Sequence, residues 1–448
     1  MENKKITKDL AESLYKIQVL SKKDKDHLHL LVTDFFGAMF AGYRQNAPFN
    51  RAIENVVLSR EGAEEACVFR QKRKFPATAA AFMNSAYGHG AELDDGNKKA
   101  MGHAGVHVIP AVFALADKLG SSGEDVLIAL ATGYEAYIRI SAAAQPGLVK
   151  RGFHSTGMAG TLGCTAACAR LFGLDAQGIE DAVALSTTLS GGLLSYGDSR
   201  PAIKPLNPGK AAENGVFAAM LTNEGVKGPE EALEGPNGWF HAVTDKVHEE
   251  MLLEGDHLLL HDCYFKLYPS CRHTHCTIEA AVNLSSQVRP EEIKKVDIYI
   301  YPNAIKLAGQ IRYPKDGDDT KFSIHYTTAC ALKNGTYGIA DMDNFHIGEE
   351  MVALIEKIEI IPDESMENRK AAIRGARVEI EKNNGEILTE TVLVPKGDPE
   401  KPLTREDIIA KLRTCAAGQA DDALIDRLVA VIEDIKGEKI FVNPMSLI

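Results

Sequence analysis

The hydrophobic pattern changes twice along the chain, and these changes limit the folds that the sequence can adopt. Up to about residue 262, apolar residues recur at helical spacing, and stretches such as 124–144 and 155–172 are long enough for core helices. From about residue 263, apolar and polar residues alternate, as in Val296, Ile298 and Ile300, which predicts strands. Helical spacing returns after about residue 403, for example from Asp422 to Ile435.

This order predicts a mainly α protein in which a large all-helical domain is interrupted by a smaller α+β domain. A chain of 448 residues is long enough for two domains. We assign residues 1–262 to the first part of the helical domain, 263–402 to the α+β domain, and 403–448 to the C-terminal return of the helical domain. Within the middle part, Asn383-Asn384-Gly385 between two alternating stretches predicts a β-hairpin.

The net charge, the first residues, the length of the apolar runs and the cysteine spacing argue against several classes of protein. A net charge of −12 argues against a nucleic acid or an anionic membrane as partner. The first residues lack the apolar stretch of a signal peptide, and the longest apolar run, 108–116, is too short for a bilayer. The 8 cysteines have no framework spacing, which is typical of thiols in a reducing compartment. We therefore expect a soluble, cytoplasmic protein.

A metal site is the main alternative among the motifs that carry chemistry. One candidate cluster comprises Cys271, His273, His275 and Cys276. A second is the pair His103 and His107, which has helix-face spacing. No Cys-x-x-Cys pair occurs, and Gly105 and Pro110 argue against a regular helix around the second pair. We predict that no metal is bound. A Gly-x-Ser-x-Gly nucleophile elbow and a phosphate-loop lysine motif are also absent from the sequence.

Four stretches mix small residues, prolines and charged residues within apolar sequence. They are Gly90–His103, Lys150–His154, Ser199–Leu206 and Lys266–His275. Each alone has an ordinary structural interpretation, because an acidic pair before glycine is usually a turn and a single histidine is usually structural. Only their combination and order along the chain point to a function.

Together with Gly133-Tyr134-Glu135 and Phe322-Ser323-Ile324-His325-Tyr326, these stretches resemble the MmgE/PrpD family in the same order along nearly the whole chain. This family includes 2-methylcitrate dehydratase, cis-aconitate decarboxylase and iminodisuccinate epimerase. The resemblance implies a helical domain with an α+β lid, a homodimer, and catalysis without a metal or an organic cofactor. It also implies a small anionic polycarboxylate as substrate.

Carried over position by position, the resemblance gives a set of candidate site residues. The family's pocket residues fall on His103, His154, Lys204, Lys266 and Tyr326, and its acidic motif contains Asp94. We add Cys271 to the catalytic candidates, and we add Arg200 and His275 to Asp94 and Lys266 as candidates for substrate binding. Lysines would stabilise an enolate-like dianion, and a neutral histidine would take a proton from carbon. Which histidine acts as base, and whether Tyr326, the other histidine or Cys271 acts as acid, stays open.

The sequence also departs from the decarboxylase pattern. Glu92 stands where the decarboxylase has aspartate, Gly96 where it has threonine, and Cys271 where it has a functional histidine. One extra residue precedes His103. We therefore predict a hydro-lyase that dehydrates a 2-methylcitrate-like acid. The alternatives are an epimerase or isomerase of an amino- or hydroxy-dicarboxylate, a cis-aconitate-type decarboxylase, and an inactive helical scaffold.

Overall fold

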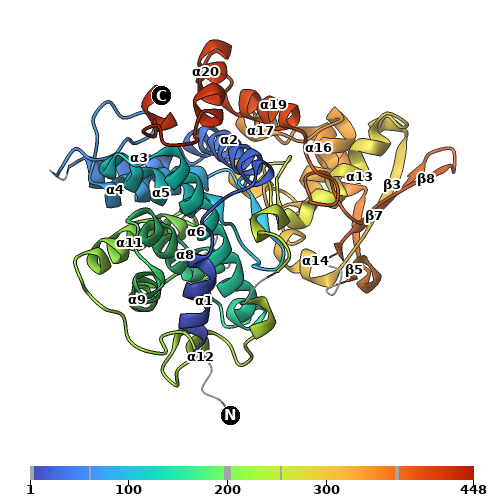
Figure 1. The fold of residues 1–448 in the computed structure, drawn as a ribbon. Coiled ribbons are helices and arrows are strands. Elements are labelled where there is room, and N and C mark those ends of the chain that lie inside the picture. The colour runs from blue at the N-terminus through green and yellow to red at the C-terminus, as the bar shows by residue number, and fades with distance from the viewer. Residues whose placement is uncertain (1–4, 60–61, 196–202, 253–254, 369–372) are drawn as a thin grey trace. The chain divides into compact units, whose positions relative to one another are not determined.

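The computed structural model describes residues 5–59, 62–195, 203–252, 255–368 and 373–448, and these form two compact units (Figure 1). The helical unit comprises residues 1–90, 94–263 and 405–448, and the mixed unit comprises 91–93 and 264–404. The sequence pattern placed the two boundaries at 262/263 and 402/403; in the structure they fall at 263/264 and 404/405. The predicted fold class, helices with an α+β part, is confirmed.

The helical unit contains most of the helices of the described residues. These are α1 (Ile6–Tyr15), α2 (Lys22–Gln45), α3 (Ala47–Leu58), α4 (Ala77–Gly88), α5 (Gly105–Leu119), α6 (Gly123–Ala144), α7 (Gly147–Lys150), α8 (Ser155–Leu171), α9 (Ala176–Ser186), α11 (Leu206–Asn223), α12 (Trp239–Val243), α19 (Arg405–Ala416) and α20 (Asp422–Glu433). Short elements are the strands β1 (Gly96–Asn97) and β2 (Cys263–Tyr264), which ends in the mixed unit, and the 3₁₀ turns η1 (Thr187–Leu189), η2 (Glu249–Met251), η3 (Leu259–Asp262) and η7 (Pro444–Leu447).

Helices α6 and α8 pack against each other at the centre of this unit; α5 packs on both, α11 packs on α8, and α4 packs on α5 and α11. Helices α6 and α8 approach closely because small residues face each other: a Cβ on Gly163 would lie 2.7 Å from the Cβ of Tyr137 and 3.1 Å from the carbonyl oxygen of Gly133. Helix α6 is long and apolar enough to cross a membrane by length and composition alone. Its apolar window is 100% buried inside the fold, however, which is the pattern of a core helix.

Gly105 and Pro110 argued against a regular helix around His107, and this prediction is wrong. Helix α5 begins at Gly105 and continues through Pro110 to Leu119. Proline is tolerated there because its missing N–H leaves only one hydrogen bond of the helix unmade. His103 nevertheless precedes the helix, so His103 and His107 do not share a helix face.

The C-terminal residues complete the helical unit. Helices α19 and α20 (red in Figure 1) pack against α2 (blue), from the other end of the chain. One buried ion pair joins α19 to α2, because Nζ of Lys411 lies 2.6 Å from Oδ1 of Asp34. Both side chains are at most 5% exposed, so each charge depends on the other for compensation.

The mixed unit combines a four-stranded sheet with shorter helices. Its helices are α13 (His275–Ser285), α14 (Pro302–Ala308), α15 (Gly317–Thr320), α16 (Ile324–Asn334), α17 (Ile339–Asp343) and α18 (Glu349–Glu356), with 3₁₀ turns η4 (Arg272–Thr274), η5 (Pro290–Glu292) and η6 (Glu364–Met366). Its strands are β3 (Ile293–Ile300), β4 (Ile358–Pro362), β5 (Glu367–Asn368), β6 (Ile373–Arg374), β7 (Ala376–Lys382) and β8 (Ile387–Val392).

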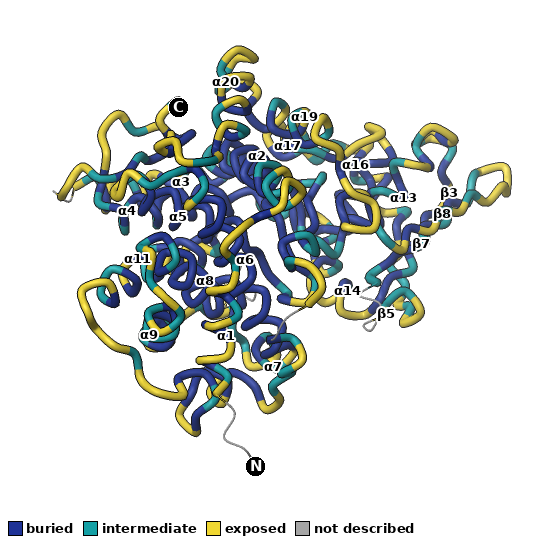
Figure 2. The backbone as a smooth tube through the Cα atoms, in the orientation of Figure 1, coloured by how far each residue is buried: buried dark blue, intermediate teal, exposed yellow. Residues whose placement is uncertain are grey.

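The main sheet has the order β4-β3-β7-β8, with β3 parallel to β4 and antiparallel to β7. Val296, Ile298 and Ile300 of β3 are fully buried, as their alternation predicts. The hairpin is confirmed: β7 pairs with β8 in register from Glu381↔Ile387 to Ala376↔Val392. Figure 2 shows its exposed turn at residues 383–386.

Candidate active site

His103 lies at the end of a tight loop that leads from β1 into α5. The loop is closed by two main-chain hydrogen bonds between Asn97 and Gly102, of 2.8 and 3.4 Å. Met101 has a φ of 52°, a left-handed conformation that non-glycine residues rarely adopt. Such backbone strain is common near functional side chains, and here it lies two residues before His103, one of the two candidate bases.

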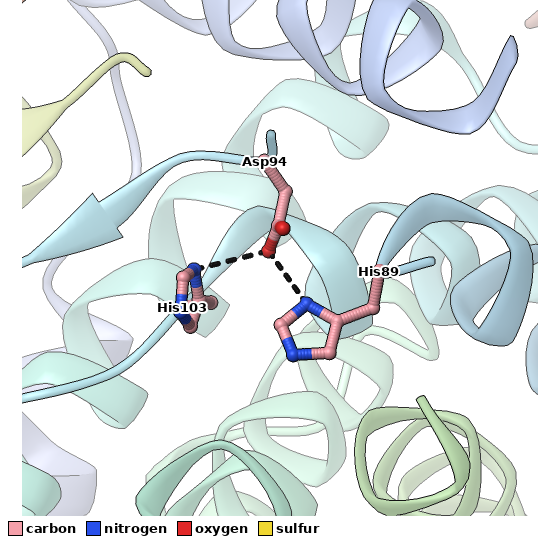
Figure 3. Close-up of side chains that lie close together, drawn as sticks. All are labelled: His89, Asp94 and His103. Carbon is pink, nitrogen blue, oxygen red and sulfur yellow. Dashed lines mark hydrogen bonds and ion pairs between the residues drawn. The ribbon is translucent and has the colours of Figure 1, made fainter. Parts of the chain in front are cut away.

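The ring of His103 is held by the carboxylate of Asp94 (Figure 3) and by the main-chain oxygen of the next residue, Asp95. Its Nδ1 lies 3.1 Å from Oδ2 of Asp94 and 2.6 Å from the main-chain oxygen of Asp95. Both oxygens accept hydrogen bonds, so Nδ1 carries the ring proton. The neutral imidazole then has its lone pair on Nε2, which is the arrangement of a general base.

Asp94 also accepts a hydrogen bond from a second histidine. Nδ1 of His89 lies 3.0 Å from the same Oδ2 atom (Figure 3). The Asp94 side chain is only 1% exposed. Burial alone would raise the pKa of Asp94, but the neighbouring His89 and His103 hold it well below its usual range. Asp94 is therefore an ionised carboxylate that orients two imidazole rings.

Asp95 differs from Asp94 in its protonation state. Burial, followed by the charges of Asp94 and Asp34, raises the pKa of Asp95 to about 8. Its Oδ1 accepts from the N–H of Gly105 at 3.0 Å, and its Oδ2 lies 3.1 Å from the hydroxyl of Tyr134. A Cβ on Gly105 would lie 2.4 Å from that hydroxyl and 2.9 Å from Oδ1, so only glycine fits here. Asp95 thus fixes the loop as a neutral acid.

His154 also lies near His89. The centroid of the His89 ring is 4.9 Å from that of His103 and 6.2 Å from that of His154. His154 immediately precedes α8, and its N–H donates to the carbonyl of Gly192 at 3.0 Å. Its Nδ1 lies 3.0 Å from Nδ2 of Asn207, in the first turn of α11. The helical unit therefore brings together three predicted residues: Asp94, His103 and His154.

Lys204 belongs to the same part of the helical unit. It is half-buried in the turn before α11, and its carbonyl accepts the N–H of Asn207 at 3.2 Å. Its main chain is thus linked to the residue that contacts His154. Arg200, predicted to bind a carboxylate, lies outside the described residues. A surface pocket of about 500 Å³ elsewhere in this unit, beside Arg139 and His257, is lined by none of the predicted residues.

The other predicted residues belong to the mixed unit. Lys266 is 1% exposed, and its Nζ donates to the carbonyl oxygen of Glu92 at 3.0 Å and to Oε2 of Glu92 at 3.3 Å. Its charge is therefore compensated by a carboxylate of the chain itself. Glu92 has a φ of 54°, so this contact also stabilises an unusual backbone conformation.

Tyr326, Cys271 and His275 are held by local contacts within the mixed unit. Tyr326 is buried in the first turn of α16, and burial raises the pKa of its hydroxyl, which makes it a poor proton donor. Cys271 is half-buried and donates its N–H to the carbonyl of Lys321 at 2.9 Å. His275 is 1% exposed, with its ring 5.3 Å from that of Tyr268. Their predicted roles, and the meeting of all candidates in one cleft, stay predictions.

Among the described residues, one cluster has the composition of a metal site. Ligand atoms of His89, Asp94 and His103 lie within 4.8 Å of one another. The carbonyl of Asp95 at 2.6 Å from Nδ1 of His103 favours a proton on that nitrogen, and a protonated nitrogen cannot bind a metal ion. Neither Cys271 nor His107 belongs to this cluster: Nδ1 of His107 lies 3.3 Å from Sγ of Cys164 instead. The hydrogen-bonded arrangement therefore fits the residues better than a metal centre.

Exhaustive treatment with EDTA, followed by gel filtration, is expected to leave the enzymatic activity within about twofold of the untreated protein, because proton transfer by histidine needs no metal. Metal analysis of the purified protein should give much less than one equivalent of zinc or iron. Loss of activity that added Zn²⁺ restores would instead assign the three-residue cluster to a metal.

The sequence did not single out several residues that build this site. His89 stands five residues before Asp94, directly ahead of the Gly90–His103 stretch, but a lone histidine carries little information. The pairing of Glu92 with Lys266 is a contact between residues far apart in the chain. Asn207 resembles an ordinary helix-start residue. Only the opposite charge states of Asp94 and Asp95 have a local sequence signal, since adjacent buried carboxylates rarely ionise together.

Comparison with known proteins agrees with the motifs. The chain matches the model of the MmgE/PrpD N-terminal domain over residues 9–251 and that of the MmgE/PrpD C-terminal domain over residues 268–434. A cis-aconitate decarboxylase of Aspergillus terreus is 27% identical over 428 residues, which cover 89% of this chain and 86% of that protein. The cis-aconitate decarboxylase of Homo sapiens is 24% identical over 450 residues, 97% of this chain and 92% of that protein. The chain therefore belongs to the MmgE/PrpD family.

Proposed function

We propose that the chain is a lyase that acts on a small di- or tricarboxylic acid by general acid–base catalysis, and that its reaction is the dehydration of a 2-methylcitrate-like hydroxy acid. The observation that carries this proposal is the arrangement of His103, whose Nδ1 proton is directed to Asp94 and Asp95. Membership of the family and relatives that are named lyases support the reaction type. A helical scaffold would have no need for two imidazoles on one buried carboxylate.

The first step is the removal of a proton from carbon beside a substrate carboxylate. Nε2 of His103 takes the proton, the C–H bond breaks, and its electrons move toward the carboxylate to give an enolate-like dianion. Asp94 stabilises the imidazolium that results, because its low pKa keeps it ionised. The positive charge that the dianion needs is proposed to come from Lys204 and, once it is released from Glu92, from Lys266.

In the second step the dianion expels the hydroxyl group from the neighbouring carbon. The C–O bond breaks, a carbon–carbon double bond forms, and the leaving oxygen takes up a proton to depart as water. Tyr326 is a weaker candidate for this acid than its sequence position implied, because burial raises its pKa. The other donors that we propose to test are His154, the thiol of Cys271 and the imidazolium of His103.

Decarboxylation is the second candidate, because the two relatives described above are named cis-aconitate decarboxylases. Loss of CO₂ from such an acid also passes through a carbanion that a positioned proton donor must quench, so the same histidines would serve. The departures at Glu92, Gly96 and Cys271 argue against it. Epimerisation needs only proton exchange at one carbon, and it is the third outcome of the test below.

The proposal is tested by incubating the protein with 2-methylcitrate, citrate, cis-aconitate and aspartate-derived acids in deuterium oxide and following the mixtures by proton NMR. Dehydration of the hydroxy acid is expected, and the same reactions with His103→Ala measure the background. Release of CO₂ from cis-aconitate alone would replace the dehydratase by the decarboxylase. Deuterium exchange without a new product, lost in Cys271→Ser, would identify an epimerase. If none of these acids reacts or exchanges, the proposed function is wrong.

A further inference from the structure

His103 and His154, whose rings both lie near that of His89, have different hydrogen-bond partners. Nδ1 of His103 faces the oxygens of Asp94 and Asp95, which accept hydrogen bonds. Nδ1 of His154 instead faces Nδ2 of Asn207, which donates. Since a nitrogen that accepts a hydrogen bond cannot carry a proton, the neutral His154 ring has its proton on Nε2. The two rings therefore adopt opposite tautomers.

The orientation of the Asn207 amide is fixed by a second contact. Nδ2 of Asn207 also lies 3.3 Å from the carbonyl oxygen of Leu193, which only accepts. Rotating the amide by half a turn would place two oxygens against each other, so the nitrogen faces both Leu193 and His154. The amide fits because of glycine: a Cβ on Gly192 would lie 3.3 Å from its Cγ, and a Cβ on Gly157 would lie 3.2 Å from its Cβ.

The main chain holds His154 beside this amide. Residues 152–154 run antiparallel to residues 192–194, with a bridge between Phe153 and Leu193. The N–H of Leu194 donates to the carbonyl of Gly152 at 2.8 Å, and the N–H of His154 donates to that of Gly192 at 3.0 Å. The carbonyl of His154 accepts the N–H of Met158 at 2.9 Å, a hydrogen bond of the first turn of α8. His154 itself is buried, so its ring has little contact with water.

From this geometry we propose that His154 is a neutral electrophile rather than a base, and that Asn207 is the positioning residue that keeps it so. The Nε2–H of His154 donates a hydrogen bond to the substrate oxygen on which negative charge develops when His103 removes the proton. Protonation of Nδ1 would direct its N–H at the N–H of Asn207, so the amide opposes the imidazolium form. The assignment of roles rests on the proposed function, but the tautomers do not.

The tautomers are measured by two-bond ¹H–¹⁵N correlation spectra of the full-length protein labelled with ¹⁵N-histidine, with His154 assigned by its loss in His154→Gln. In the wild type, Nδ1 of His154 is expected to be unprotonated and Nε2 protonated. In Asn207→Asp the carboxylate accepts from the ring, so Nδ1 becomes protonated. Helix α11 tolerates this change, because an acidic residue in the first turn of a helix is favourable. A protonated Nδ1 in the wild type would overturn the proposal.

Steady-state kinetics test whether His154 acts as an electrophile. At alkaline pH, where the ring carries one proton, Asn207→Asp is expected to lower kcat and kcat/KM together by about 10²-fold, the usual effect of removing one donor to a developing anion. The loss should shrink as the pH falls, since the imidazolium again has a proton on Nε2. A merely structural role of Asn207 would give no such pH profile.

Asn214→Asp is the matched control. Asn214 lies in the same helix, and its Nδ2 donates to the carbonyl of Leu189 at 2.8 Å, so the same change removes a similar contact away from His154. Its kcat should stay within about threefold of the wild type. An equal loss in both variants, or an unchanged kcat in Asn207→Asp at alkaline pH, would refute the electrophile. If the wild type turns over no acid, the proposed function fails, while the spectra still decide the tautomers.

Discussion

His103→Ala is expected to lower kcat by about 10²-fold or more on whichever acid the wild-type enzyme turns over. The imidazole is the base of the proposed reaction, and Nδ1 is held at 2.6 Å from the carbonyl of Asp95, so a water molecule in the same space would lack both the basicity and the orientation. The effect should appear in kcat and kcat/KM alike, because the interaction belongs to the transition state. Steady-state kinetics with a coupled or NMR assay measure it.

His29→Ala is the control for removing an imidazole from the helical unit. His29 lies on α2, with Nε2 3.0 Å from the carbonyl of Ile435, and it has no role in the proposed chemistry. Circular dichroism and melting curves should show that both variants remain folded. Activity of His103→Ala within about tenfold of the wild type would remove the assignment of the base.

Asp95→Asn is expected to stabilise the protein at neutral and alkaline pH. The folded state raises the pKa of Asp95 from the usual 3.8 to about 8, so between these values the unfolded chain is ionised and the folded chain is not. The stability contributed by neutral Asp95 is fully present below pH 4 and is lost as the pH rises toward 8. The amide cannot ionise and so avoids this loss, which should amount to a few kcal/mol by pH 8.

Chemical denaturation of both proteins between pH 4.5 and 8.5 measures the difference in free energy of unfolding. Asp94→Asn is the matched control with the opposite sign. Since the folded state lowers the pKa of Asp94, its charge stabilises the protein above the usual value, and the amide variant should be less stable at neutral pH. A difference between Asp95→Asn and the wild type that does not change with pH would show that Asp95 is ionised in the fold.

The helices and the hairpin could be predicted because their signals are local. The spacing of apolar residues located α6 and α8 to within about a residue, and the Asn-Asn-Gly turn located the β7–β8 hairpin. Helix α5 was doubted because of Pro110, and it forms because burial of its apolar residues outweighs one missing hydrogen bond. The formation of α5 therefore depends on tertiary packing, which a local sequence pattern does not reveal.

The candidate site was predictable only in part. His103, His154 and Asp94 were recognised from their motifs, and the helical unit brings them together. The tautomer of His154 was not, because it depends on Asn207, a partner that the chain supplies from a distant position. Lys266 shows the same difficulty: a lysine that the sequence presents as a free cation has a buried glutamate beside it.

The discontinuous helical unit also has a consequence for synthesis on the ribosome. Residues 264–404 form most of the mixed unit and emerge from the ribosome before α19, which supplies Lys411. Until then Asp34 of α2, made 377 residues earlier than Lys411, lacks this lysine as compensation for its buried charge. Because domains generally fold as units during synthesis, the mixed unit can form first, while the helical unit that holds His103 and His154 is completed last. A nascent chain stalled before residue 405 would therefore expose apolar helix surface and depend on chaperones that protect it.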